Sequence, residues 1–168
     1  MSRQGEPMVR QGERSGLTRR AVLAMLAAAA AFGVRQLAAE PAPMVKVWKD
    51  PSCGCCSGWV EHLRRSGFTV SAIDTADLAA IKGALGVPGE LVSCHTAKID
   101  TYVIEGHVPA AAIRRLLVER PVALGLAVPG MPIGSPGMEG GTPQLYDVVL
   151  FGAQSTTVFG RYIGTEPG

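Results

Sequence analysis

Three cysteines within four residues constrain the fold of this chain more than any other feature. Cys53, Cys55 and Cys56 follow a short apolar run at residues 45–48 and precede an amphipathic stretch at residues 57–66. The apolar run predicts a buried strand and the stretch predicts a helix, so the cysteines lie at a strand-to-helix junction. Unpaired backbone N–H groups and the helix dipole stabilise a thiolate there, and we expect low thiol pKa values. Thiolates bind metals and also attack disulfides, so position alone leaves both functions open.

A second cysteine motif is expected to face this junction. Cys53 and Cys56 have the Cys-x-x-Cys spacing of a thioredoxin-type redox pair, which predicts a thioredoxin-like scaffold. In that fold, a loop some forty residues later lies opposite the cysteines, just before the next strand. Cys94 and His95 occupy that place in the chain. This alignment brings four sulfurs and an imidazole together, a donor set that suits Cu(I) or Zn(II).

The same cysteines allow two other interpretations. A thiol-disulfide oxidoreductase would use Cys53 and Cys56, although the additional Cys55 argues against a plain enzyme of this class. A disulfide-stabilised binding module would pair Cys53 with Cys56 and Cys55 with Cys94, because a bridge between the adjacent Cys55 and Cys56 is strained. We favour copper over zinc because adjacent cysteines cannot comfortably chelate one tetrahedral ion but can bridge two ions.

The rest of the chain predicts the α/β fold class. Strands are expected at residues 45–48, 68–73 and 99–104, helices at residues 57–66, 74–85 and 109–119, and a hairpin at residues 146–151 and 156–162. Between residues 125 and 143, ten of nineteen residues are Gly or Pro, which excludes regular structure there. The expected architecture is thioredoxin-like: a small mixed sheet flanked by helices, with a C-terminal β-hairpin and a Gly/Pro/Met-rich loop.

The N-terminal region, residues 1–39, predicts a signal peptide. Arg19 and Arg20 precede an uncharged, Ala-rich run at residues 21–34, and Ala39 ends a small-residue cleavage site. The arginine pair resembles the twin-arginine export signal. The run is shorter than the roughly 20 residues that cross a bilayer as a helix, so no permanent membrane span is expected. We expect a single domain at residues 40–168, working in a periplasm where cysteines tend to oxidise.

The distribution of charge excludes nucleic acid as a partner. Residues 1–39 carry six Arg and two Glu, which leaves ten Lys or Arg against twelve Asp or Glu in residues 40–168. The basic excess therefore belongs to the predicted leader. The remaining chain has no basic run, and aromatic residues make up 5% of the sequence. It lacks both the phosphate-binding stripe and the stacking platform that nucleic-acid binding requires.

Taken together, four motifs resemble the CopG-type family of periplasmic copper-resistance proteins. They are Lys-Asp-Pro-Ser-Cys-Gly-Cys-Cys at residues 49–56, Ser-Cys-His-Thr-Ala at residues 93–97, Glu-Gly-His-Val-Pro at residues 105–109, and Gly-Met-Pro through Gly-Met-Glu at residues 130–139. The resemblance implies a thioredoxin-like fold and copper bound by the matching cysteines. It also implies that the copper can form a thiolate-bridged cluster of several Cu(I) ions. It implies copper ions and other periplasmic copper-handling proteins as partners, and it does not establish enzymatic turnover.

Eight residues make up the predicted metal site. They are four cysteines, two histidines and two methionines: Cys53, Cys55, Cys56, Cys94, His95, His107, Met131 and Met138. His95 is the strongest non-thiol candidate because it adjoins Cys94, whereas His107 is supported mainly by its motif. Met131 and Met138 supply soft thioethers that could cover a Cu(I) site or receive copper from it, and core packing is the alternative for both.

Overall fold

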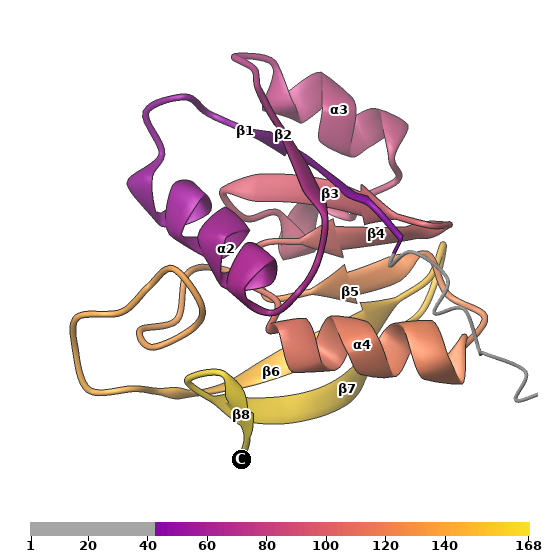
Figure 1. Cartoon of the computed structure of the whole chain (residues 1–168). Helices are drawn as coiled ribbons and strands as arrows, with labels where there is room; N and C mark the ends of the chain where they lie inside the picture. Colours follow the sequence, from indigo (N-terminus) through magenta and orange to yellow (C-terminus); the bar gives the residue numbers. More distant parts are fainter. Residues whose placement is uncertain (1–42) are drawn as a thin grey trace, which may run out of the picture. The chain divides into compact units, whose positions relative to one another are not determined.

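The structure is a computed structural model and describes residues 43–168; the predicted signal peptide and its arginine pair lie outside the described residues. Three α-helices, one 3-10 turn and eight strands follow one another along this part of the chain (Figure 1). In chain order they are β1 (Val45–Lys49), α2 (Gly54–Arg65), β2 (Val70–Asp74), α3 (Leu78–Ala84), η1 (Gly89–Leu91), β3 (His95–Ile99), β4 (Tyr102–Glu105), α4 (Ala110–Glu119), β5 (Gly125–Ala127), β6 (Leu145–Phe151), β7 (Thr156–Ile163) and β8 (Glu166–Pro167).

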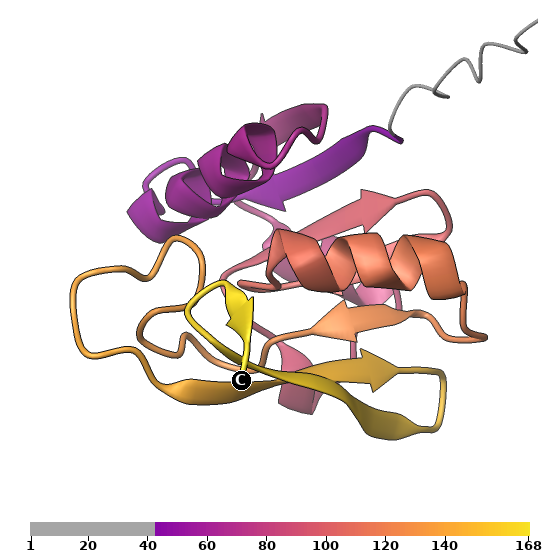
Figure 2. The same ribbon diagram turned by 60° about the horizontal axis from the view of Figure 1, so that its bottom comes forward.

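The strands form one mixed sheet, which confirms the predicted α/β class. In the part of the chain that the structure describes, the sheet has eight strands and is larger than the sequence predicted. The order across the sheet is β2-β1-β3-β4-β5-β6-β7-β8. Strands β1 and β2 are parallel, as are β4 and β5, and the other neighbours are antiparallel. The predicted C-terminal hairpin is confirmed as β6 and β7, which Figure 2 shows as a long ribbon at the lower edge of the sheet.

Alternation of side chains along the strands builds a hydrophobic core on each face of the sheet. In β4, Tyr102 and Ile104 join the larger core, which also contains apolar residues of α2 and α4. Val103 points the other way, into a smaller core near the end of α3. Because successive strand residues face opposite sides, β4 is buried on both faces. The helices α2 and α4 therefore cover one face of the sheet, where Figure 1 shows them, and α3 covers the other.

The predicted strand at residues 99–104 is wrong, because this segment turns back on itself. Strand β3 ends at Ile99 and β4 begins at Tyr102, and the two pair as an antiparallel hairpin. Asp100 occupies the left-handed region at a φ of 54°, which Asp tolerates better than most residues. The Asp-Thr pair at residues 100–101 is thus a tight turn. The hairpin brings the residues on either side of it, including His95 and His107, to one end of the sheet.

Two further boundaries differ from the sequence prediction. Helix α2 begins at Gly54 rather than at residue 57, because Cys53 caps it: its sulfur accepts a hydrogen bond from the Cys56 N–H. The region at residues 125–143 is not wholly irregular, since Gly125 opens the short strand β5. A side chain at Gly125 would overlap the backbone of Val103, so glycine is what permits the parallel pairing of β4 and β5. Within residues 43–168, none of the helices has the length and apolar character to span a membrane.

Candidate metal centre

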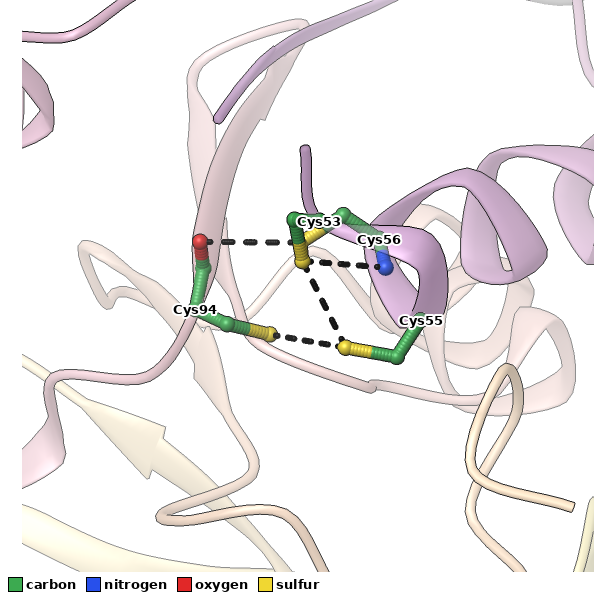
Figure 3. A group of neighbouring side chains, drawn as sticks. All are labelled: Cys53, Cys55, Cys56 and Cys94. Atoms are coloured by element: carbon green, nitrogen blue, oxygen red, sulfur yellow. Dashed lines mark hydrogen bonds between the residues drawn. A yellow bond between two sulfur atoms is a disulfide. The ribbon is translucent and has the colours of Figure 1, made fainter. Parts of the chain in front are cut away.

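The first turn of α2 carries three of the four cysteines. Cys53 and Cys56 form a disulfide, so the first pair of the alternative disulfide interpretation is present. Cys55 is a free thiol, and its sulfur lies 3.4 Å from that of Cys53 (Figure 3). Because Cys53 is the helix cap, its sulfur faces the unpaired N–H groups of the helix start, as the sequence predicted.

Cys94 comes from the other side of the site, immediately before β3. Its thiol is free, and its sulfur lies 3.9 Å from the Cys55 sulfur, which is contact without a bond (Figure 3). The second disulfide of the alternative interpretation, between Cys55 and Cys94, is therefore absent from this structure. The four sulfurs Cys53, Cys55, Cys56 and Cys94 all lie within 4.8 Å of one another, a spacing that can hold a metal ion.

Two buried histidines flank the Cys94 sulfur. His107 Nε2 lies 2.9 Å from it and His95 Nδ1 lies 3.4 Å from it. The three ligand atoms form a second group within 4.8 Å of one another, which shares Cys94 with the cysteine group. The loop between β4 and α4 supplies His107, and the start of β3 supplies His95. The hairpin of β3 and β4 is what joins these two distant sequence motifs.

The tautomer of His107 follows from its second nitrogen. His107 Nδ1 lies 2.8 Å from the carbonyl oxygen of Pro136, which can only accept a hydrogen bond. Nδ1 therefore carries the proton, and the lone pair of Nε2 points at Cys94. Metal-binding histidines commonly donate their other N–H to a backbone carbonyl in this way. His107, which the sequence supported only by its motif, thus has the geometry of a ligand.

Burial keeps these groups neutral while no metal is bound. Burial lowers the pKa of His95 well below its usual value, and the neighbouring His107 and Lys82 add to the effect. Burial also lowers the pKa of His107. For Cys94, burial together with the nearby Cys55 raises the thiol pKa to about 12. The Cys94 S–H therefore donates to His107 Nε2 at neutral pH, and a metal ion that binds here must displace a proton.

The donor atoms around Cys94 have the chemistry of a site for a soft metal ion. His95 is fully buried, its ring centroid lies 4.4 Å from that of Trp59, and its Nε2 has no hydrogen-bond partner among the described residues. A buried imidazole normally has both nitrogens satisfied. His95 instead directs Nδ1 towards a thiol, and thiol and imidazole donors together suit Cu(I) or Zn(II). The side chains around Cys94 thus form a cluster that is able to hold a metal ion.

The Gly/Pro-rich loop packs directly against the cysteine turn. Gly58 and Gly137 cross so closely that a Cβ added to Gly58 would lie 3.0 Å from the Gly137 Cα. Met138 follows Gly137 and is half-buried, whereas Met131 is 52% exposed. The structure therefore places Met138 on a segment beside the site and Met131 at the surface. Metal ligation by the two methionines stays a prediction.

Replacing Gly137 with alanine is expected to lower the free energy of unfolding by about 2–4 kcal/mol. Gly137 has a φ of +85°, and an added Cβ would overlap the Cys55 carbonyl oxygen and lie 2.7 Å from the Trp59 nitrogen. Gly130→Ala is the matched control, because Gly130 also has positive φ but has open space around it. Urea unfolding should show a smaller loss for the control. Equal losses would mean that the close crossing contributes nothing.

Acidification is expected to destabilise the metal-free protein through His95. Its native pKa lies below the unfolded value of about 6.5. The unfolded chain therefore binds more protons below pH 6.5, so this stability is present above that pH and is lost as the pH falls. Between pH 7 and pH 5 the loss has an upper limit of about 2 kcal/mol for one such histidine, reached when it stays neutral in the folded protein. Urea unfolding at both values measures it; the slope should be shallower for His95→Gln, and a flat profile would contradict the prediction.

Several residues that shape the site escape sequence reasoning. Pro136 contributes through its carbonyl oxygen, which no residue pattern reveals. The buried pair of Lys82 and Glu105 also touches the segment before Cys94 through the Ser93 N–H. The sequence did contain one signal for this pair: Glu105 follows the apolar residues of β4. A buried Glu there would have predicted a charged partner, because Glu is rarely fully buried without one.

Comparisons with known proteins identify a matching family and similar solved structures. Residues 91–138 match the family described as "Protein of unknown function, DUF411". A solved structure of the copper resistance protein CopG, Form 2, is 46% identical; the match covers 72% of this chain and 98% of that chain, with a TM-score of 0.68. Form 1 of the same protein is 45% identical over 76% of this chain and 99% of that chain, also at 0.68. No match was found among curated proteins.

Proposed function

Because the chain belongs to the CopG copper-resistance family, we propose that it binds copper as cargo, holding several Cu(I) ions through its reduced cysteines. The role that follows is copper resistance or homeostasis, by sequestering the metal. Soft thiolates and imidazoles favour Cu(I) over the hard cations that carboxylates bind. The proposal rests on the donor set, which suits Cu(I) or Zn(II), and on the family, whose solved member is a copper resistance protein.

The observation that carries the proposal is the spacing of the sulfurs. The Cys55 sulfur lies 3.4 Å from that of Cys53 and 3.9 Å from that of Cys94. Both distances are shorter than twice a metal–sulfur bond of about 2.3 Å. One ion can therefore contact two neighbouring sulfurs, and Cys55 can bridge two ions. This sharing favours a thiolate-bridged multinuclear site over four separate ligands around a single ion.

The disulfide must open before all four sulfurs can take part. A dithiol reductant would transfer two electrons and two protons to the bridge between Cys53 and Cys56 and would itself become a disulfide. Copper then displaces the thiol protons, because the thiolate is the ligand. Oxidation state and copper content are thus linked in this proposal.

Anaerobic Cu(I) titration of the fully reduced protein tests the proposal. The bound ratio comes from elemental analysis after removal of weakly held metal, and Zn(II) titrated in parallel tests selectivity. We expect saturation above one copper per chain, with Zn(II) displaced by Cu(I). A reduced protein that retains no copper, or that holds one Zn(II) in preference, would overturn the proposal.

Thiol-disulfide oxidoreductase is the second candidate function, and a specific observation favours it. Cys53 and Cys56 form a disulfide at the start of a helix, the position where a Cys-x-x-Cys pair exchanges with protein disulfides. The strand order β2-β1-β3-β4 supports the proposal that this half of the sheet is thioredoxin-like. A disulfide-reduction assay on metal-free protein, with Cys53→Ser as control, separates this candidate from copper storage.

Export to the periplasm remains part of the proposal. It is supported by the predicted leader at residues 1–39 and by the arginines at residues 19 and 20. In that compartment the protein would exchange copper with other copper-handling proteins, with surface Met131 as a thioether that could pass the ion on. Cell fractionation with N-terminal mass analysis tests this, and an uncleaved chain in the cytoplasm would contradict it.

A further inference from the structure

A buried ion pair lies beside the metal centre but is not part of it. Glu105 ends β4 and is fully buried, and its Oε1 lies 2.5 Å from the ammonium of Lys82, a residue of α3 that is 6% exposed. The same oxygen accepts a hydrogen bond of 2.7 Å from the Ser93 N–H. Glu105 Oε2 has no partner among the described residues. One carboxylate oxygen therefore takes both donors.

The energetics argue that this pair is not kept for stability alone. Removing two charges from water costs several kcal/mol per ion, and an apolar pair of similar size is often as stable or more so. The pair is also incompletely satisfied, because Oε2 is unpaired in a buried position. What the pair does provide is a fixed, charge-neutralised acceptor for one backbone N–H, that of Ser93.

Ser93 is the residue that needs such an anchor. It precedes Cys94 and lies outside β3, which begins at His95, so its N–H has no ladder partner. Its hydroxyl donates to the Gly130 carbonyl at 2.7 Å, and a Cβ on Gly106 would lie 2.7 Å from the Ser93 side chain. Glu105 thus joins α3, the segment before Cys94 and the strand that leads to His107.

We propose that Glu105, neutralised by Lys82, is a positioning residue for the copper site. Through the Ser93 N–H it holds Cys94 where its sulfur lies 3.9 Å from Cys55 and 2.9 Å from His107 Nε2. The inference rests on the proposed copper function but concerns the placement of Cys94, which can be measured without copper. Loss of outer partners of metal ligands typically lowers metal affinity about 10- to 100-fold.

Two double variants isolate the hydrogen-bond acceptor from the charge. Glu105→Gln with Lys82→Met keeps an acceptor oxygen for Ser93, whereas Glu105→Leu with Lys82→Met keeps neither oxygen nor charge. In competition with a chromophoric Cu(I) chelator, we expect the first to stay within about 3-fold of the parent affinity and the second to fall about 10- to 100-fold. Urea unfolding of both metal-free variants should remain cooperative, because replacing both members of a buried ion pair leaves no unpaired buried charge.

A copper-free measurement keeps the inference separate from the proposed function. In a background with Cys53→Ser and Cys56→Ser, oxidation by glutathione disulfide reports how readily Cys55 and Cys94 meet. We expect the equilibrium constant for forming the Cys55–Cys94 disulfide to be at least about 10-fold smaller in the leucine variant than in the glutamine variant. A disulfide forms only when the two cysteines are held at a specific distance and orientation. Equal closure in both variants would overturn the positioning role, even if copper binds. A parent that binds no copper would overturn the proposed function alone.

Discussion

Reduction of the disulfide between Cys53 and Cys56 is expected to raise the Cu(I) capacity of the protein from at most one ion to two or more. With the bridge closed, two thiols and two imidazoles remain as donors, all at or near the Cys94 sulfur. Opening it adds two sulfurs within 4.8 Å of the others. Because neighbouring sulfurs can each contact two ions, the added ligands increase the number of ions and not only their affinity.

The measurement is a pair of anaerobic Cu(I) titrations on the same preparation, with the disulfide intact or fully reduced and thiol content counted in each. The matched control carries Cys53→Ser and Cys56→Ser. It should bind at most one ion under both conditions, because it can neither form the bridge nor supply those ligands. If the reduced and disulfide forms of the parent bind the same number of ions, Cys53 and Cys56 are not part of the copper site.

The sequence predicted the positions of the three neighbouring cysteines well because the determinants of those positions are local. A strand, a turn and a helix start follow one another within about twenty residues, and these place Cys53, Cys55 and Cys56 together without any tertiary information. The position of Cys94 opposite them came from the spacing expected for the fold. The structure agrees with that placement, since the Cys94 and Cys55 sulfurs lie 3.9 Å apart.

The oxidation state and the supporting contacts could not be predicted in the same way. Spacing alone left a four-thiol site, one disulfide and two disulfides open, and the structure contains one. The hairpin of β3 and β4 was missed because Asp100 was not recognised as a turn residue, and with it the approach of Glu105 to Ser93. Contacts through backbone atoms, such as Pro136 with His107, leave no mark in residue type.

Cys94→Ser is expected to weaken Cu(I) binding more than any other single substitution in the site. Cys94 is the one residue shared by the cysteine group and the cysteine–histidine group. A serine hydroxyl is a poor, hard ligand for Cu(I), so both groups lose their common atom. Since loss of an outer partner already costs about 10- to 100-fold, we expect the affinity to fall by at least about 100-fold.

Cys55→Ser is the matched control for that substitution, because it removes a sulfur from the cysteine group and leaves Cys94 with its two histidines. In competition with a Cu(I) chelator, the disulfide form of Cys55→Ser should still bind one ion weakly, whereas the disulfide form of Cys94→Ser should bind none. The serine at position 94 can still donate to His107 Nε2, so urea unfolding of the metal-free variant should change by no more than about 1 kcal/mol. If the two variants lose Cu(I) affinity equally, Cys94 is no more important than the other cysteine ligands. A ligand shared by both groups requires the larger loss for Cys94→Ser.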